Sequence, residues 1–120
     1  VTNQTNQQVT TTEKNWGTKT DEQTSITVVI TPLDLLPESA EWKFDIVMNT
    51  HSVELDQDMT KSAVLIDNQG KEYKPLRWEG SEAGGHHREG VLIFDKITPI
   101  PKSIKLKIFG IGNVERSFIW

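Results

Sequence analysis

The chain has 120 residues, a net charge of −4 and no cysteine. This length provides one domain with a single core, and the lack of cysteine excludes disulfides, thiolate nucleophiles and cysteine-based metal sites. The acidic balance and the scattered Lys and Arg residues argue against nucleic acid as a partner, and no apolar run reaches the roughly 20 residues of a membrane-spanning helix.

The first 24 residues are rich in Thr, Gln and Asn and contain few large apolar side chains. Such a segment buries too little surface to offset the entropy of ordering it, so we predict a linker over residues 1–24. The alternative is that residues 9–16 add an edge strand, with Trp16 packed on the domain. The chain begins with Val1 rather than Met, and we expect a mature or trimmed form in which a removed N-terminal segment served as a membrane tether.

Residues 25–120 consist of short strand-like segments between turn signals. In the clearest segment Trp42, Phe44, Ile46 and Met48 fall on one face, which we expect at the centre of the core. Pro32 is expected to end the first segment, and Pro75 indicates an edge strand or a bulge in the fourth. The seven predicted strands cover residues 25–31, 41–49, 62–67, 71–78, 90–95, 103–109 and 114–120.

No helical pattern of three turns is present. Seven short strands predict an all-β fold, a two-sheet sandwich of immunoglobulin-like or cupredoxin-like type over residues 25–120. The densest group of basic residues, Lys102, Lys105 and Lys107, has the spacing of a solvated strand face.

One stretch, residues 78–90, interrupts the strand rhythm and ends with the adjacent pair His86 and His87. We interpret it as a loop, because it holds four of the eight glycines. In an immunoglobulin-like sandwich the strands 41–49 and 90–95 are antiparallel neighbours. His51, which follows the first of them, would then lie beside the pair that precedes the second. We therefore predict that His51, His86 and His87 meet at one rim of the sandwich, as a candidate site for Cu²⁺ or Zn²⁺.

Neighbouring residues in a regular strand point to opposite faces, so both histidines can serve one ion only if Gly84 and Gly85 bend the chain. Otherwise the histidines form ordinary hydrogen bonds at a strand end, or pair with carboxylates in a pH-dependent way. Further ligands in reach of the predicted site are Asp56, Asp58, Glu82 or Glu89, and for reduced copper Met48 or Met59, although Met48 fits the core better.

Other chemistry finds less support in the sequence. Asp56-Gln57-Asp58 suggests calcium but lacks the glycine and the distal glutamate of an EF-hand loop. No Gly-x-Ser-x-Gly motif is present, and no helix follows the glycines to bind a phosphate. We therefore expect no enzyme activity.

Three patterns make the chain similar to known domains. They are His51-Ser52-Val53-x-Leu55-Asp56, then Trp78-x-Gly80, then Gly84-Gly85-His86-His87-x-x-Gly90-x-Leu92-x-Phe94. Together they resemble a set of small exported bacterial β-sandwich domains, over residues 42–95. The hairpin at residues 65–75 is more weakly similar to immunoglobulin-like lipoprotein domains. The resemblance implies an extracytoplasmic domain, often tethered as a lipoprotein or by a membrane segment, and it implies no activity.

Two functions follow as hypotheses. The first is an exported non-catalytic domain that binds copper or zinc through the three histidines. The second is a monomeric cell-surface module with a structural or protein-binding role and no metal. The second predicts an exposed apolar patch or a free sheet edge as the partner surface.

Overall fold

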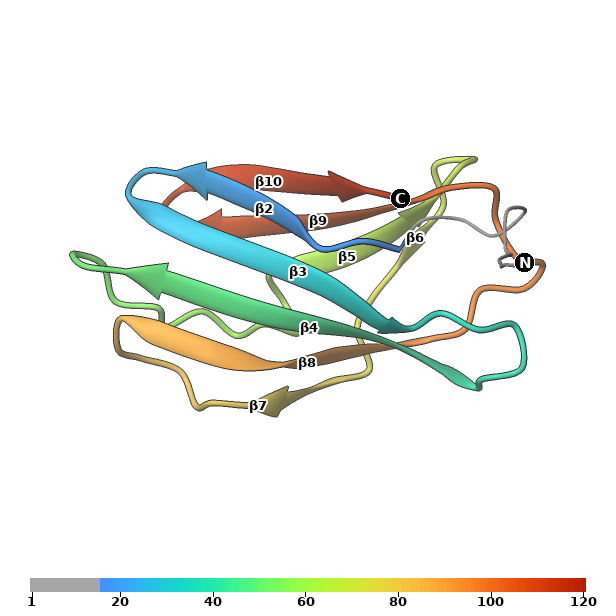
Figure 1. The fold of residues 1–120 in the computed structure, drawn as a ribbon, viewed down its shortest axis with the longest axis horizontal. Coiled ribbons are helices and arrows are strands. Elements are labelled where there is room, and N and C mark those ends of the chain that lie inside the picture. Colours follow the sequence, from blue (N-terminus) through green and yellow to red (C-terminus); the bar gives the residue numbers. More distant parts are fainter. Residues whose placement is uncertain (1–15) are drawn as a thin grey trace, which may run out of the picture.

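The computed structural model describes residues 16–120, which form two antiparallel sheets packed as a sandwich (Figure 1). The larger sheet has the strand order β2-β3-β4-β8-β7 and the smaller has β10-β9-β5-β6. This part of the chain contains no helix that could cross a membrane. Its strands are β2 Lys19–Gln23, β3 Ile26–Asp34, β4 Glu41–Thr50, β5 Ala63–Asp67, β6 Glu72–Tyr73, β7 Arg77–Gly80, β8 His87–Asp95, β9 Ile104–Ile111 and β10 Val114–Ile119.

The strand order is that of an immunoglobulin-like sandwich. The strands β3, β4, β8 and β7 take the places of A, B, E and D, while β10, β9, β5 and β6 take those of G, F, C and C′. The predicted fold class is thus confirmed. Residues 16–120 hold nine strands rather than seven, because β2 adds an edge and the predicted strand 71–78 is divided into two.

The single strand 71–78 and the expected end of the first strand at Pro32 both need correction, whereas β6 and β7 on either side of Pro75 are edge strands, as expected. Residues 71–78 are not one strand: β6 and β7 lie in different sheets, and the chain changes sheets around Pro75, which cannot donate to a ladder. Pro32 does not end the first strand, which runs on to Asp34. The register shifts between Pro32 and Asp34, so a bulge accommodates the missing N–H.

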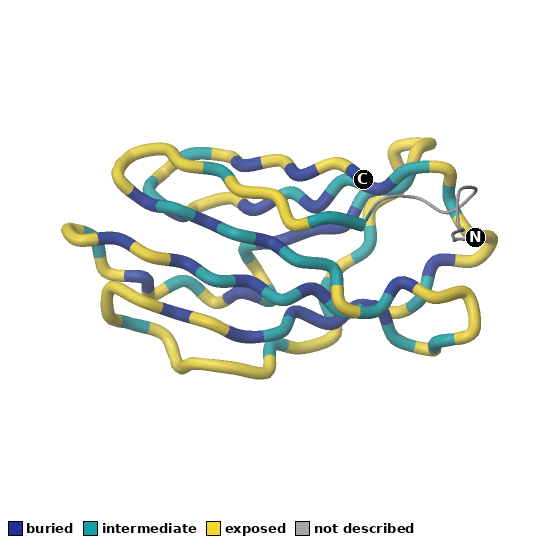
Figure 2. Tube along the Cα trace, viewed as in Figure 1, coloured by how far each residue is buried: buried dark blue, intermediate teal, exposed yellow. Residues whose placement is uncertain are grey.

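The prediction for the core is confirmed. The side chains of Trp42, Phe44, Ile46 and Met48 are at most 1% exposed, and burial alternates along β4 (Figure 2). The Phe44 ring meets that of Phe94 edge-on at 5.8 Å. Aromatic pairs of this geometry add stability beyond the area they bury, and the core between the two sheets includes this pair together with Leu106 and Phe118 of the smaller sheet.

The N-terminal part of the described chain is joined to the sandwich at several points. The strand β2 lies within the segment 1–24 and pairs with β3 at the edge of the larger sheet. Trp16 packs against the core, and the Trp120 indole N–H donates to the Gly17 carbonyl at 2.7 Å. Residues 1–15, including most of the alternative edge strand at 9–16, lie outside the described residues.

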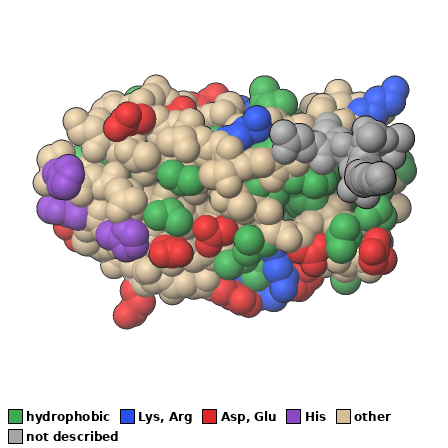
Figure 3. All heavy atoms as spheres, viewed as in Figure 1, with side chains coloured by type: hydrophobic (Ala, Val, Ile, Leu, Met, Phe, Trp, Pro, Cys, Tyr) green, Lys and Arg blue, Asp and Glu red, His purple; other side chains and the backbone are tan. Residues whose placement is uncertain are grey.

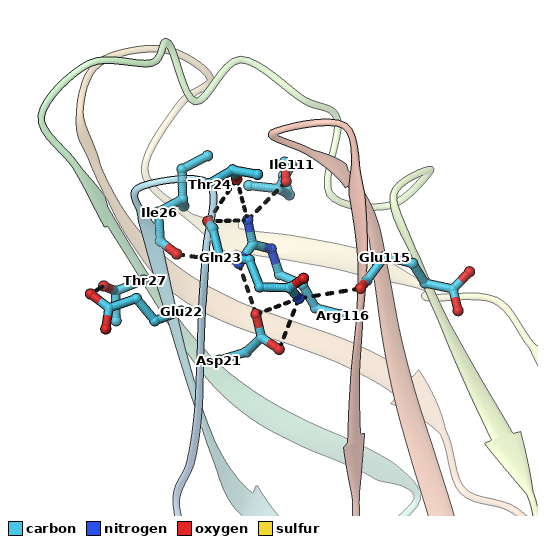
Figure 4. Close-up of polar contacts among 9 residues, drawn as sticks. All are labelled: Asp21, Glu22, Gln23, Thr24, Ile26, Thr27, Ile111, Glu115 and Arg116. Carbon is cyan, nitrogen blue, oxygen red and sulfur yellow. Dashed lines mark hydrogen bonds and ion pairs between the residues drawn. The ribbon is translucent and has the colours of Figure 1, made fainter.

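A buried arginine closes the seam between the two sheets (Figure 4). Arg116 is 0% exposed and occupies an inward position of β10, two residues before Phe118. Its guanidinium donates to the carbonyls of Gln23, Ile26 and Ile111 and to the Asp21 carboxylate. These bonds join the β2–β3 hairpin to the β9–β10 hairpin.

Candidate functional site

The predicted pairing that brings the histidines together is present. Strand β4 pairs with β8 so that Asn49 lies opposite His87, and the Thr50 N–H donates to the His86 carbonyl at 2.9 Å. His51 continues from β4 at the same end. The three histidine side chains are exposed and gather at one end of the molecule (Figure 3).

The immediate partners of the histidines are polar. His87 Nδ1 lies 2.5 Å from Asn49 Oδ1, and its Nε2 lies 3.7 Å from Glu89 Oε1. His51 lines a groove of about 500 Å³ together with Asn49, Thr27 and Glu22. Asn49 therefore contacts His87 through its side chain and lines the same groove as His51.

Within residues 16–120 no three histidine or carboxylate side chains converge as ligands of one ion. His87 is already the first residue of β8, where strand alternation applies. Of the other ligands suggested by the sequence, Met48 and Met59 pack in the hydrophobic core, and Asp58 accepts hydrogen bonds from Thr60. Metal ligation by His51, His86 and His87 stays a prediction, which titration can test.

The interpretation of residues 78–90 as a loop is wrong at both ends. Trp78 to Gly80 belong to β7, and His87 to Gly90 belong to β8. Gly80 and Gly90 lie directly opposite each other, and a Cβ atom on Gly90 would come within 2.5 Å of Trp78 Cζ2. These two glycines therefore allow close strand packing, and only residues 81–86 form a loop.

Arg88 holds that loop against the chain that follows β4. It is 2% exposed, and its guanidinium donates to the carbonyls of Gln57 at 2.7 Å and Leu55 at 3.3 Å. The Trp78 ring lies 5.3 Å from the guanidinium carbon, within range of a cation–π interaction. Burial lowers the pKa of Arg88, and the charges of Asp58 and Asp56 oppose that shift.

The backbone joins the same two segments directly. Leu55 exchanges hydrogen bonds with the glycines of the loop, from its N–H to the Gly85 carbonyl at 2.9 Å and from the Gly84 N–H to its own carbonyl at 2.8 Å. The Glu54 carboxylate accepts a bond from the Gly85 N–H. Gly84 and Gly85 have φ values of 117° and 81°, which favour glycine. These hydrogen bonds thus join the loop that precedes His86 and His87 to the segment that follows His51.

A second surface was not identified from the sequence. It is the outer face of the smaller sheet, and we call it the lysine–phenylalanine face. Three residues of β9 that alternate with the core point outward there, and Phe109 is 38% exposed. Ile119 on β10 is 56% exposed and lies opposite Lys105. The face is formed by Val64, Ile66, Lys105, Lys107, Phe109, Glu115, Ser117 and Ile119.

The charge of this face differs from that of the rest of the chain. Lys107 is 3.8 Å from Glu115, while Lys74 and Lys105 form no ion pair within the described part of the chain. Lys105 and Lys107 point outward from β9, as their spacing predicted, while Lys102 precedes the strand; Ile66 and Ile119 flank Lys105. A groove of about 290 Å³ adjoins Phe109 and is lined by Thr60, Lys61, Ala63, Val64, Glu72, Lys74 and Phe109.

The outer face of the larger sheet carries more acidic groups. Arg77 binds Glu41 and Glu79 there, which holds the pKa of the Glu41 carboxyl below its usual value, mainly through the hydrogen bond from Arg77. Burial, together with the charge of Glu89, raises the pKa of Asp45. The two outer faces of the sandwich therefore differ in charge.

Comparison of the chain with protein-family models, curated proteins and solved structures finds no match. Two features of the described residues therefore bear on function. One is the exposed histidine end, and the other is the lysine–phenylalanine face with its groove.

Proposed function

We propose that this chain is a non-catalytic immunoglobulin-like module, located outside the cytoplasm, that binds a protein partner through the lysine–phenylalanine face. The observation that carries the proposal is the exposure of Phe109 and Ile119 on that face, 38% and 56% respectively. The solvated face of an antiparallel sheet is normally polar at its outward positions. Apolar residues at such positions mark an interaction surface when they form a patch.

The cross-strand register places apolar residues beside a lysine of β9, and Phe109 follows two residues beyond Lys107 on the same strand. Lys105 lies between Ile66 and Ile119, and Lys107 lies between Val64 and Ser117. A partner that covers the apolar residues gains about 25 cal/mol for each Å² of apolar surface removed from water. The lysines between them attract an oppositely charged partner and fix its register. The apolar residues that would supply affinity and the lysines that would supply selectivity therefore lie side by side on neighbouring strands.

The location is supported by resemblance. The Gly84-Gly85-His86-His87 pattern resembles exported bacterial domains. An exported module of this kind is presented to partners at the cell surface.

Site-specific photo-crosslinking in the cells that carry the gene tests the proposal. A photoreactive amino acid replaces Ser117, which is exposed on the lysine–phenylalanine face, or Thr20, which is exposed on the larger sheet. We expect one identified protein to crosslink from position 117 and not from position 20. The crosslink is expected to disappear when Phe109→Ser and Lys105→Glu are introduced together. No crosslink from position 117, or one that the double variant leaves unchanged, would overturn the proposal.

The histidine end supports a second candidate function, the binding of Cu²⁺ or Zn²⁺. The supporting observation is the β4–β8 register, with Asn49 opposite His87, which brings the three histidines to the same end. Imidazole nitrogen is a common ligand of both ions. Calorimetric titration with Cu²⁺ and Zn²⁺ tests this second function.

A further inference from the structure

The groove beside Phe109 indicates which kind of partner segment the module accepts. We propose that it binds an extended, acidic segment that adds alongside β5 and places one aliphatic side chain in the groove. This inference rests on the proposed function and adds the conformation and the chemistry of the partner.

The extended conformation follows from an incomplete sheet edge. Strand β6 has two residues, Glu72 and Tyr73, and pairs only with Ile66 and Leu65 of β5. Beyond Tyr73 the chain leaves the sheet, and β7 belongs to the other sheet. On that side no strand of residues 16–120 pairs with Ala63 and Val64. An open edge of this kind accepts a further strand by backbone hydrogen bonding.

The groove follows that open edge and is mostly apolar at its base. Ala63 and Val64 are 4% and 9% exposed, and Phe109 forms the opposite wall. The volume of about 290 Å³ lies just below the range for drug-sized ligands, which begins at about 300 Å³. The groove is therefore small for such a ligand, and it can accept one aliphatic side chain of an extended segment. Leucine and isoleucine have the matching chemistry.

The lysines at the rim of the groove indicate that the partner segment is acidic. Lys61 and Lys74 line the groove and are exposed, and Lys105 and Lys107 lie further along the same face. Lys74 and Lys105 have no ion-pair partner in the described part of the chain, and the charge of Lys61 acts on the exposed Asp58. Carboxylates of a partner would pair with these free lysines. The single carboxylate in the groove lining, Glu72, would disfavour an acidic residue next to it and so restrict the register.

The test uses three blocked peptides and the ¹⁵N-labelled full chain, observed by NMR. The first peptide alternates glutamate with small residues around one central leucine. The second replaces the leucine with serine, and the third replaces every glutamate with lysine. We expect shift changes at Ala63, Val64, Lys74 and Phe109 with the first peptide, at least tenfold weaker binding of the second and no binding of the third. Binding of the first is expected to weaken as salt is raised.

Charge reversal provides the matched control. The double variant Lys61→Glu and Lys74→Glu is expected to lose the glutamate peptide and to gain the lysine peptide. Lys43→Glu, on the outer face of the larger sheet, is expected to leave both results unchanged. Equal binding of all three peptides, binding of none, or shift changes confined to the histidine end would each overturn the inference.

The two proposals fail in different ways. If a protein crosslinks from position 117 and the peptides bind without preference, the protein-binding function stands and the acidic, extended segment is rejected. If no protein crosslinks from that position, the function itself falls, whatever the peptides do.

Discussion

Arg116 Nη1 lies 2.8 Å from Asp21 Oδ1, and the arginine side chain is completely buried while that of Asp21 is 22% exposed. This ion pair connects β10 with β2, the outermost strands of the two sheets on one side of the sandwich. The same guanidinium donates to three backbone carbonyls of the neighbouring turns. Its polar contacts therefore fix how the hairpins meet.

Removing this side chain should be costly. Arg116→Met removes the guanidinium that donates to the Asp21 carboxylate and to the carbonyls of Gln23, Ile26 and Ile111, and leaves Asp21 only the Gln23 amide as a side-chain donor. We expect a loss of about 3–5 kcal/mol in the free energy of unfolding, the range found when one partner of a buried ion pair is removed. Urea unfolding measures it. The control is Glu115→Gln, which breaks the exposed pair with Lys107 and should cost less than about 1 kcal/mol.

The turn between β2 and β3 holds two residues, Thr24 and Ser25, in an unfavourable backbone conformation. Ser25 has a φ of 62°, in the left-handed region that costs a non-glycine residue about 1–2 kcal/mol. Ser25→Gly should stabilise the chain by about 0.5–1 kcal/mol, since part of the gain is lost to the greater freedom of unfolded glycine. Thermal unfolding measures the change. Asn113→Gly is the control, because asparagine tolerates its φ of 59°. A larger gain at Asn113 than at Ser25 would contradict this explanation.

Gly90 is expected to tolerate no side chain. A Cβ atom there would lie 2.5 Å from Trp78 Cζ2 and 2.8 Å from Gly80 Cα. Gly90→Ala should displace the indole from Arg88 and cost about 1–3 kcal/mol, as overpacking does. Denaturant unfolding and Trp78 fluorescence report the two effects. In the double variant with Trp78→Ala, the loss in the free energy of unfolding should be smaller than the sum of the two single losses, because the clashing ring is gone. Full additivity would contradict the proposed clash.

Two aspartates should affect stability with opposite signs. Hydrogen bonds, first from the Lys71 N–H, then from the Gln69 N–H and the Tyr73 hydroxyl, hold the pKa of Asp67 below its usual value. Its ionised form therefore stabilises the fold, and this contribution is lost as the pH falls through the lowered pKa. Burial raises the pKa of Asp45, with a further contribution from the charge of Glu89. The ionised form of Asp45 is thus disfavoured in the folded chain.

Unfolding across a pH series should separate them. At pH 7 Asp67→Asn is expected to destabilise the chain and Asp45→Asn to stabilise it. Both differences should shrink as the pH falls below about 4, where the unfolded aspartates take up protons. Effects of equal sign at pH 7 would show that the charges do not act as described.

Metal binding at the histidine end is tested by calorimetric titration with Cu²⁺ and Zn²⁺. If the site exists, one ion binds per chain, and the combined change of His51, His86 and His87 to alanine abolishes binding. The single variant His87→Ala shows whether β8 contributes a ligand. Equal binding by the wild type and the triple variant would exclude this site.

Several features could be predicted from residue patterns alone. The alternation around Trp42 and Phe44 identified the core face of β4, and the expected pairing of β4 with β8 brought the histidines to one end. The alternation that marks Phe118 as buried also extends to Arg116, so the inward position of Arg116 was visible in the sequence. Arg88 lies in the stretch interpreted as a loop, and its inward position became clear only from β8. The hydrogen-bond partners of both arginines were not visible in the sequence, because those carbonyls come from segments distant in the chain.

The glycines show the opposite case. The composition of residues 78–90 indicates a loop, since glycine is frequent in turns. In the structure Gly80 and Gly90 face each other across paired strands, where a larger residue would clash with Trp78. The reason for a glycine here is the proximity of another strand, which no local pattern contains.

The sequence by itself determined the fold class, the central core face and the absence of cysteine chemistry, because alternation and composition are local properties that act through burial. Tertiary structure alone decided the division of residues 71–78 between two sheets, the partners of Arg116 and Arg88, and the meeting of Phe109, Ile119 and the lysines on one face. These features depend on which strands become neighbours. The packing of the whole chain decides which strands become neighbours, because these contacts join residues that are far apart in the sequence.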